Sequence, residues 1–75
     1  MNKDRRKRLA TIIKEAGQLM EQLEQLKEAE EQAMDNTSEG LQGTERYEQM
    51  EQAAETLDVA VYSLEEIINS LEEIA

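Results

Sequence analysis

Paired carboxylates at helical spacing are the residues of this sequence with the clearest potential for chemistry. Glu28 and Glu31 are separated by two residues, and Glu55 and Asp58 repeat the spacing after an interval of 23 residues. On a helix such a pair lies on one face. Carboxylate oxygens are the hard ligands with which Mg²⁺ is held against phosphates. Four inward-facing acids would therefore indicate metal-dependent phosphate chemistry.

These four acids resemble the ExxE and ExxD signature of the all-alpha nucleoside-triphosphate pyrophosphatases, whose inward-facing acids hold magnesium. Apolar residues recur along this chain at intervals of three and four and form a stripe on each expected helix. Glu28, Glu31 and Glu55 fall on the outward side of that pattern, and only Asp58 flanks the apolar stripe. The chain holds 18 acidic residues among 75, so a match at this spacing arises easily by chance. We therefore predict no metal site.

The chain lacks the side chains on which most other catalytic and metal sites depend. It has no Cys, His, Trp, Phe or Pro. This composition excludes disulfides, thiolate and imidazole ligands, His-based catalysis and the Glu-x-x-His pairs of di-iron bundles. A chain of 75 residues also has little room for a substrate pocket with its catalytic groups. We expect a protein that is not an enzyme and uses no cofactor.

The net charge of -10 is divided unevenly along the chain. A basic segment, Lys3 to Arg8, could contact phosphates, but it has no aromatic neighbours and the acidic remainder would repel a nucleic acid. We expect it to neutralise the acidic end of the second helix, not to bind nucleic acid. The columns of Glu suggest one alternative function, an acidic DNA mimic that competes for a basic groove. The acids expected beside the basic segment are Glu65, Glu66, Glu72 and Glu73.

The sequence also bears on the compartment. No apolar run approaches the roughly 20 residues that a membrane-spanning helix needs. The basic N-terminus leads into a charged amphipathic helix and not into the apolar core of a signal peptide. The absence of cysteine fits a reducing environment. We expect a soluble, cytoplasmic protein that makes no membrane contact.

Apolar residues recur at intervals of three and four in two runs, separated by a polar break that contains glycine. Such heptad spacing predicts two long helices. We expect one all-α domain over 1–75, with helices over about 3–34 and 44–74 and a loop over 35–43. Two helices joined by a short connection pack antiparallel, which makes the fold a two-helix hairpin.

Cap residues mark the expected helix ends. Asn2 or Asp4 is a candidate cap of the first helix, and Thr44 of the second. Within the break, Asn36 together with Glu39 can cap one short turn.

The apolar face of each helix is wider than a single neighbour can cover, because a second row borders the main stripe. A homodimer that forms a four-helix bundle would cover both rows. We predict its interface at Ile13, Met20, Ile67 and Ile74. The main stripe is assigned to Leu9, Ile12, Ala16, Leu19, Leu23, Leu26, Glu30 and Ala33, and to Tyr47, Met50, Ala54, Leu57, Val61, Leu64, Ile68, Leu71 and Ala75.

The break and the second helix share a pattern with known proteins. The break holds Asp35-Asn36 and Leu41-Gln42, the second helix opens with Thr44-Glu45-Arg46-Tyr47-Glu48, and Leu-Glu units follow as far as Leu71-Glu72. This pattern resembles small uncharacterised helical-hairpin proteins encoded by phages and mobile elements of gut-type Gram-positive bacteria. Ser38 stands where that family has a proline. The resemblance implies a mobile-element setting and no particular activity.

Residues 35–48 are the predicted working surface, because loops on rigid scaffolds carry function more often than helical exteriors do. The leading hypothesis is a dimeric binding protein that occupies a host or phage protein, such as a component of host defence. The alternatives are a sponge for a nucleotide-like ligand at the dimer interface, around Arg46 and Tyr47, and a purely structural oligomerisation element. The candidate partner-binding residues are Asn36, Glu39, Gln42, Arg46 and Tyr47.

Overall fold

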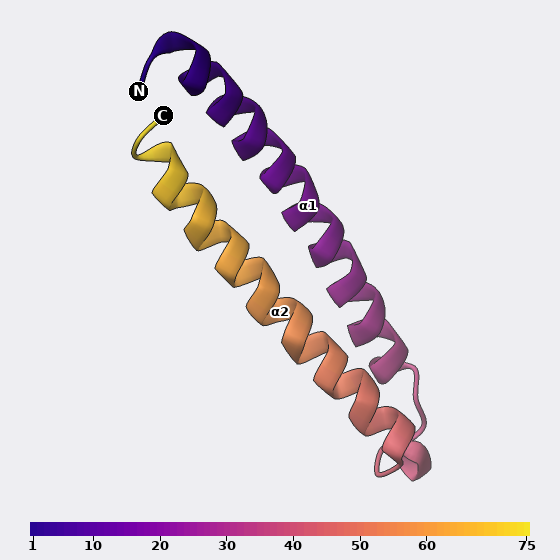
Figure 1. Cartoon of the computed structure of the whole chain (residues 1–75). Helices are drawn as coiled ribbons and strands as arrows, with labels where there is room; N and C mark the ends of the chain where they lie inside the picture. The colour runs from indigo at the N-terminus through magenta and orange to yellow at the C-terminus, as the bar shows by residue number, and fades with distance from the viewer.

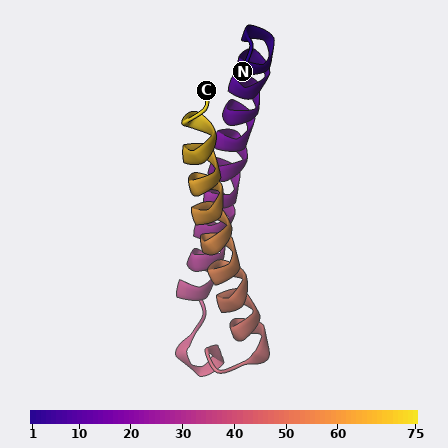
Figure 2. The same ribbon diagram turned by 60° about the vertical axis from the view of Figure 1, so that its left-hand side comes forward.

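The computed structural model describes residues 1–75 and is an antiparallel helical hairpin. Helix α1 spans Lys3–Asp35, a 3-10 turn η1 spans Glu39–Leu41, and helix α2 spans Glu45–Glu72. Figures 1 and 2 show both chain ends at one end of the rod and the connection at the other. The Cα atoms extend over 59 × 14 × 13 Å. The predicted all-α hairpin is confirmed.

Each helix begins at a side-chain cap. The Oδ1 atom of Asn2 accepts a hydrogen bond from the amide of Arg5 at 2.9 Å, and Thr44 Oγ1 accepts one from the amide of Tyr47 at 3.3 Å. Both bonds satisfy amides of a first turn that have no partner within the helix. The Thr44 hydroxyl also donates to the carbonyl of Leu41 at 2.7 Å, which joins the cap of α2 to η1.

The connection differs in detail from the predicted capped turn. Asn36 is the C-cap of α1, and its amide donates to the carbonyl of Gln32 at 3.0 Å. The Thr37 hydroxyl donates to the carbonyl of Ala33 at 2.8 Å, which closes the end of the helix. Asn36 therefore belongs to α1 and does not cap a turn with Glu39.

The two helices meet along one apolar seam. Ala54 on α2 and Leu9 on α1 are the only residues with less than a tenth of their surface exposed, at 8% and 7%. Each helix is covered on one side by a single neighbour, so the rest of the seam is only half-buried. On α2 the predicted main stripe lies in the seam as far as Leu71, whereas Ala75, the last residue of that stripe, is exposed beyond the end of the helix. The seam residues of α2 are Tyr47, Met50, Ala54, Leu57, Val61, Leu64, Ile68 and Leu71.

On α1 the seam is shifted by one position from the prediction. Leu9, Ala16, Leu23 and Glu30 lie in it as expected, and between them the chain offers two rows at equivalent spacing. Intervals of three and four residues fit either row, because both rows alternate with these four residues. The half-buried row is Ile13, Met20, Lys27 and Met34, and the exposed row is Ile12, Leu19, Leu26 and Ala33.

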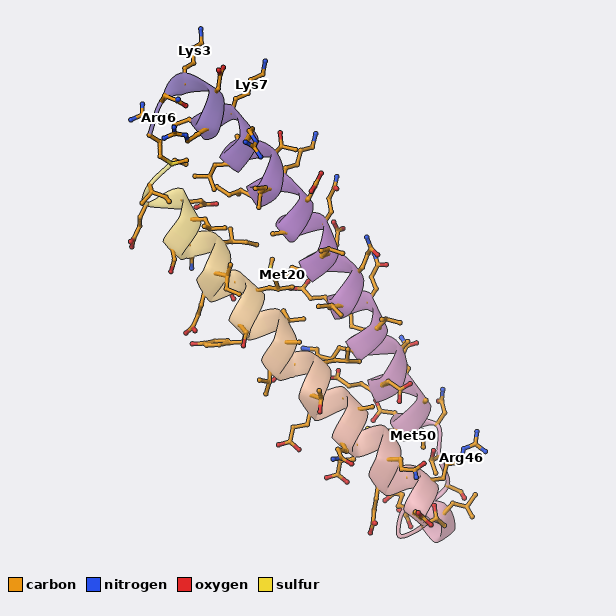
Figure 3. The ribbon with its side chains drawn as sticks, in the orientation of Figure 1. Lys3, Arg6, Lys7, Met20, Arg46 and Met50 are labelled. Carbon is orange, nitrogen blue, oxygen red and sulfur yellow. The ribbon has the colours of Figure 1, made fainter.

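This shift places two residues of the predicted dimer interface in the seam of the hairpin. Ile13 and Met20 are half-buried in the hairpin itself, since α2 is the only neighbour of α1. Figure 3 shows the Met20 side chain between the two helices. Ile67 and Ile74, predicted with them, are 50% and 56% exposed.

Candidate functional site

The connecting end of the hairpin surrounds a hollow with a volume of about 640 Å³. Small-molecule sites in proteins usually measure about 300–1,000 Å³. We call this feature the loop-end hollow. It is lined by Ala33, Asn36, Thr37, Ser38, Leu41, Thr44, Arg46, Tyr47 and Met50.

Three of the five predicted site residues line the loop-end hollow. Asn36 comes from the end of α1, and Arg46 and Tyr47 come from the first turn of α2. Glu39 and Gln42 do not line it and are exposed at the two ends of the η1 turn. The loop-end hollow thus combines a cation, an aromatic ring and an amide.

Leu41 is a lining residue that the sequence-based prediction missed. It is 55% exposed and follows the glycine of η1. The sequence does distinguish Leu41 as a candidate site residue, because it is the single large apolar residue of the break between the heptad runs. An exposed apolar side chain beside a cation is a combination that a protein partner can cover.

Local structure fixes the positions of Arg46 and Tyr47. The amide of Tyr47 is bonded to the Thr44 side chain, so the first turn of α2 is held to the connection. Tyr47 begins the seam and is half-buried, whereas Arg46 is exposed. Figure 3 shows Arg46 and Met50 at this end of the hairpin. The Arg46 guanidinium has no carboxylate within 4.0 Å, since Lys27–Asp58 is the only ion pair in the molecule.

The basic N-terminal segment does not pair with the acids of α2 as predicted. Figure 3 shows Lys3, Arg6 and Lys7 on the first turns of α1, at the end of the rod where the chain ends lie. Antiparallel packing brings the last turn of α2 to that end, but no ion pair forms within 4.0 Å. The charges of this segment remain available to solvent or to another molecule.

The four carboxylates with metal-ligand spacing do not converge. Glu28, Glu31 and Glu55 are exposed, and Asp58 Oδ1 lies 3.1 Å from Lys27 Nζ. The molecule contains no group of three or more His, Cys, Asp or Glu side chains placed to hold a metal ion. Neither helix has a segment that is long and apolar enough to cross a membrane.

Lys27 has a perturbed acid-base equilibrium. Its pKa is raised from 10.5, first by the hydrogen bond that it donates to Asp58 and then by the negative charge of that carboxylate. Glu31 and Glu24 raise the pKa further through their charges. The shift follows from a structural ion pair in the seam, at a distance along the rod from the loop-end hollow.

Comparison with known proteins supplies no relative. No family model matches the chain, and no curated protein or solved structure matches it. A functional proposal therefore rests on the surfaces of the hairpin itself.

Proposed function

We propose that the chain is a non-enzymatic binding protein that occupies a protein partner through the loop-end hollow. The observation that carries this proposal is the grouping of Arg46, Tyr47 and the exposed Leu41 around one hollow at the tip of a rigid rod. Arginine and tyrosine are among the residues that contribute most to protein interfaces. No competing carboxylate holds the Arg46 guanidinium.

The chemistry of the hollow indicates what the partner presents. Arg46 suits a carboxylate, with which a guanidinium forms paired hydrogen bonds. Leu41 and the half-buried ring of Tyr47 suit an apolar side chain next to that carboxylate. The resemblance to mobile-element proteins favours a host or phage protein as the partner, such as a component of host defence.

Affinity capture from a host lysate tests the proposal. We expect a retained protein that is lost when Leu41→Asp and Arg46→Glu are combined, because the contact then loses its apolar group and reverses its charge. Lys14→Glu is the control for the Arg46 change, since it makes the same charge reversal at an exposed position on α1. Equal retention by both variants would rule out the loop-end hollow as the contact.

The proposal includes a homodimer in the form of a four-helix bundle. Nine large apolar residues of the single hairpin are at least half exposed, among them Leu19, Leu26 and Ile67. A solitary hairpin leaves this surface in water, and a second copy would remove part of it. Light scattering should give at least twice the chain mass of 8.6 kDa. A fully helical species at the single-chain mass would contradict the dimer.

A ligand sponge is a second candidate, supported by the size of the hollow and by its arginine and tyrosine. A guanidinium and an aromatic ring can hold the phosphate and the base of a nucleotide-like molecule. The surrounding acids oppose a multiply charged anion such as a nucleotide more than they oppose a single carboxylate. Mass spectrometry of the denatured protein would detect a released small molecule, and Arg46→Gln should abolish its retention. A released protein partner and no small molecule would favour the first proposal.

A further inference from the structure

One long side of the hairpin is apolar and largely exposed, with Ala53 and Ala60 half-buried. Seven of its eight residues come directly before a seam residue, and Ile74 comes before the exposed Ala75. In an antiparallel pair these preceding positions turn to the same side of the hairpin, because the helices run in opposite directions. We call this side the apolar face. It consists of Ile12, Leu19, Leu26 and Ala33 from α1, Ala53, Ala60 and Ile67 from α2, and Ile74 just beyond the end of α2.

The opposite side of the hairpin is acidic. Its residues come directly after seam positions, as Glu24 follows Leu23 and Glu65 follows Leu64. Water suits this side, whereas the isoleucines and leucines of the apolar face are 50–56% exposed. The contrast identifies the side of the hairpin that another molecule would cover. The acidic side carries Glu24, Glu31, Glu51, Asp58, Glu65 and Glu72.

The register of the helices divides the apolar face into rungs. The contact of 3.1 Å between Lys27 Nζ and Asp58 Oδ1 places these two residues at about the same height. Counting away from this pair in opposite directions aligns the remaining residues. From the connection to the chain ends, the rungs are Ala33 with Ala53, Leu26 with Ala60, Leu19 with Ile67, and Ile12 with Ile74. The face therefore changes from small side chains at the connection to large ones at the chain ends.

We propose that a second copy of this chain covers the apolar face with its connection at the opposite end of the bundle. Ile12 and Ile74 then lie over Ala33 and Ala53 of the second copy. Every layer combines large with small side chains, as dense packing requires. With both connections at one end, one layer would hold four alanines and another four isoleucines. That alternative leaves a void at one end and crowds the other.

Charge favours the same orientation. The half of the hairpin with the chain ends, residues 1–22 and 64–75, has six basic and seven acidic side chains, for a net charge of -1. The other half, residues 23–63, has two basic and eleven acidic side chains, for a net charge of -9. Opposed copies place each -9 half against a nearly neutral half. Aligned copies would place the two -9 halves together, where like charges repel.

This orientation also extends the loop-end hollow. A smaller hollow of about 200 Å³ at the start of α1 is lined by Met1, Arg5, Arg8, Leu9 and Ile12. In the opposed dimer this hollow lies next to the loop-end hollow of the other copy, so Arg5 and Arg8 add two cations beside it. The inference rests on the dimer of the proposed function and predicts two partner sites, one at each end of the rod.

Disulfide mapping tests the orientation, because the chain has no cysteine and each introduced thiol is unique. Gln22 and Ser63 are exposed, lie at mid-height, and flank the apolar face on α1 and α2. In the opposed dimer each of these residues meets its own counterpart. We expect Gln22→Cys alone and Ser63→Cys alone to form covalent dimers under mild oxidation. Gln25→Cys, exposed and on the side of α1 away from α2, should remain a single chain.

The alternatives give different results. If only a mixture of Gln22→Cys and Ser63→Cys chains is linked, the connections lie at one end and the proposed orientation is wrong. If no variant is linked and light scattering gives the single-chain mass, the second copy is excluded as the occupant. Failure of partner binding is separate, since it would appear as a covalent dimer that retains no host protein.

Discussion

Lys27 on α1 and Asp58 on α2 form the one ion pair between the helices, with Nζ and Oδ1 3.1 Å apart. Lys27 occupies a seam position between Leu23 and the half-buried Glu30, and Asp58 follows the seam residue Leu57. The Asp58 side chain is 68% exposed, and exposed ion pairs contribute little to stability. A single ion pair in a largely apolar seam instead favours one register over its alternatives.

The pair predicts a pH dependence that disappears in Asp58→Asn. The hydrogen bond to Asp58 and its charge raise the pKa of Lys27 from 10.5. A pKa that is raised by folding stabilises the hairpin below the unfolded value, and the effect is lost as pH rises through the folded value. Asp58→Asn should slightly lower the thermal midpoint at pH 7 and match the wild type once Lys27 is deprotonated.

Thermal unfolding followed by circular dichroism across alkaline pH checks this prediction. Glu55→Gln is the control, because Glu55 is an exposed acid that makes no ion pair. It should leave the difference between neutral and alkaline pH unchanged. A deficit of Asp58→Asn that persists above the Lys27 pKa would show that the aspartate acts by another route.

The heptad spacing was sufficient to predict the hairpin and the α2 seam as far as Leu71. Side-chain type predicted the Thr44 cap and left the first cap open between Asn2 and Asp4, of which the structure uses Asn2. The heptad spacing was insufficient for the α1 seam, because Leu9, Ala16 and Leu23 fit two rows equally well. The structure takes the row with Lys27, where the ammonium reaches Asp58. If charged residues are excluded from the seam, the row with Leu26 is favoured over the row with Lys27. The pairing between the two helices determines which row of α1 lies in the seam. The sequence of α1 considered by itself does not reveal that pairing.

The sequence predicts only part of the candidate site, because only some of its residues lie where helix ends fix their positions. Asn36, Arg46 and Tyr47 lie next to helix ends, whose positions follow from capping and periodicity. Glu39 and Gln42 lie at the ends of η1, and their directions depend on a 3-10 turn that the sequence does not specify. Composition identified the connection as the distinctive surface, and the turn geometry selected which of its side chains line the hollow.

Gly17→Ala should stabilise the protein by about 1 kcal/mol, the usual difference between glycine and alanine within a helix. A Cβ atom added at Gly17 meets no other atom within 4 Å, so no contact opposes the gain. The thermal midpoint should rise by about 4–8 °C in a domain of this size. A fall would show that another chain approaches Gly17 closely, as in a dimer through the acidic side of the hairpin.

Thr44→Ala should destabilise the protein by about 1 kcal/mol, because the Tyr47 amide loses its cap. The change also removes the bond from the Thr44 hydroxyl to the Leu41 carbonyl, so η1 should become more mobile. Chemical denaturation would measure the loss, and hydrogen exchange at residues 39–47 would detect the mobility. Thr11→Ala, at an exposed position within α1, should be neutral or slightly stabilising. Equal effects of both changes would exclude a specific role for the cap.

Neighbouring residues on α1 should respond differently to the same change, because Met20 lies in the seam and Leu19 on the apolar face. Met20→Asp should cost about 2 kcal/mol or more at any protein concentration, since it places a charge between the helices. Leu19→Asp should act through the proposed dimer, so its loss of helicity should be reversed as the protein concentration is raised. Circular dichroism from about 1 to 500 μM, a range chosen to span weak and strong association, would separate the two. If Met20→Asp is the variant that recovers with concentration, the two rows of α1 have been assigned in reverse.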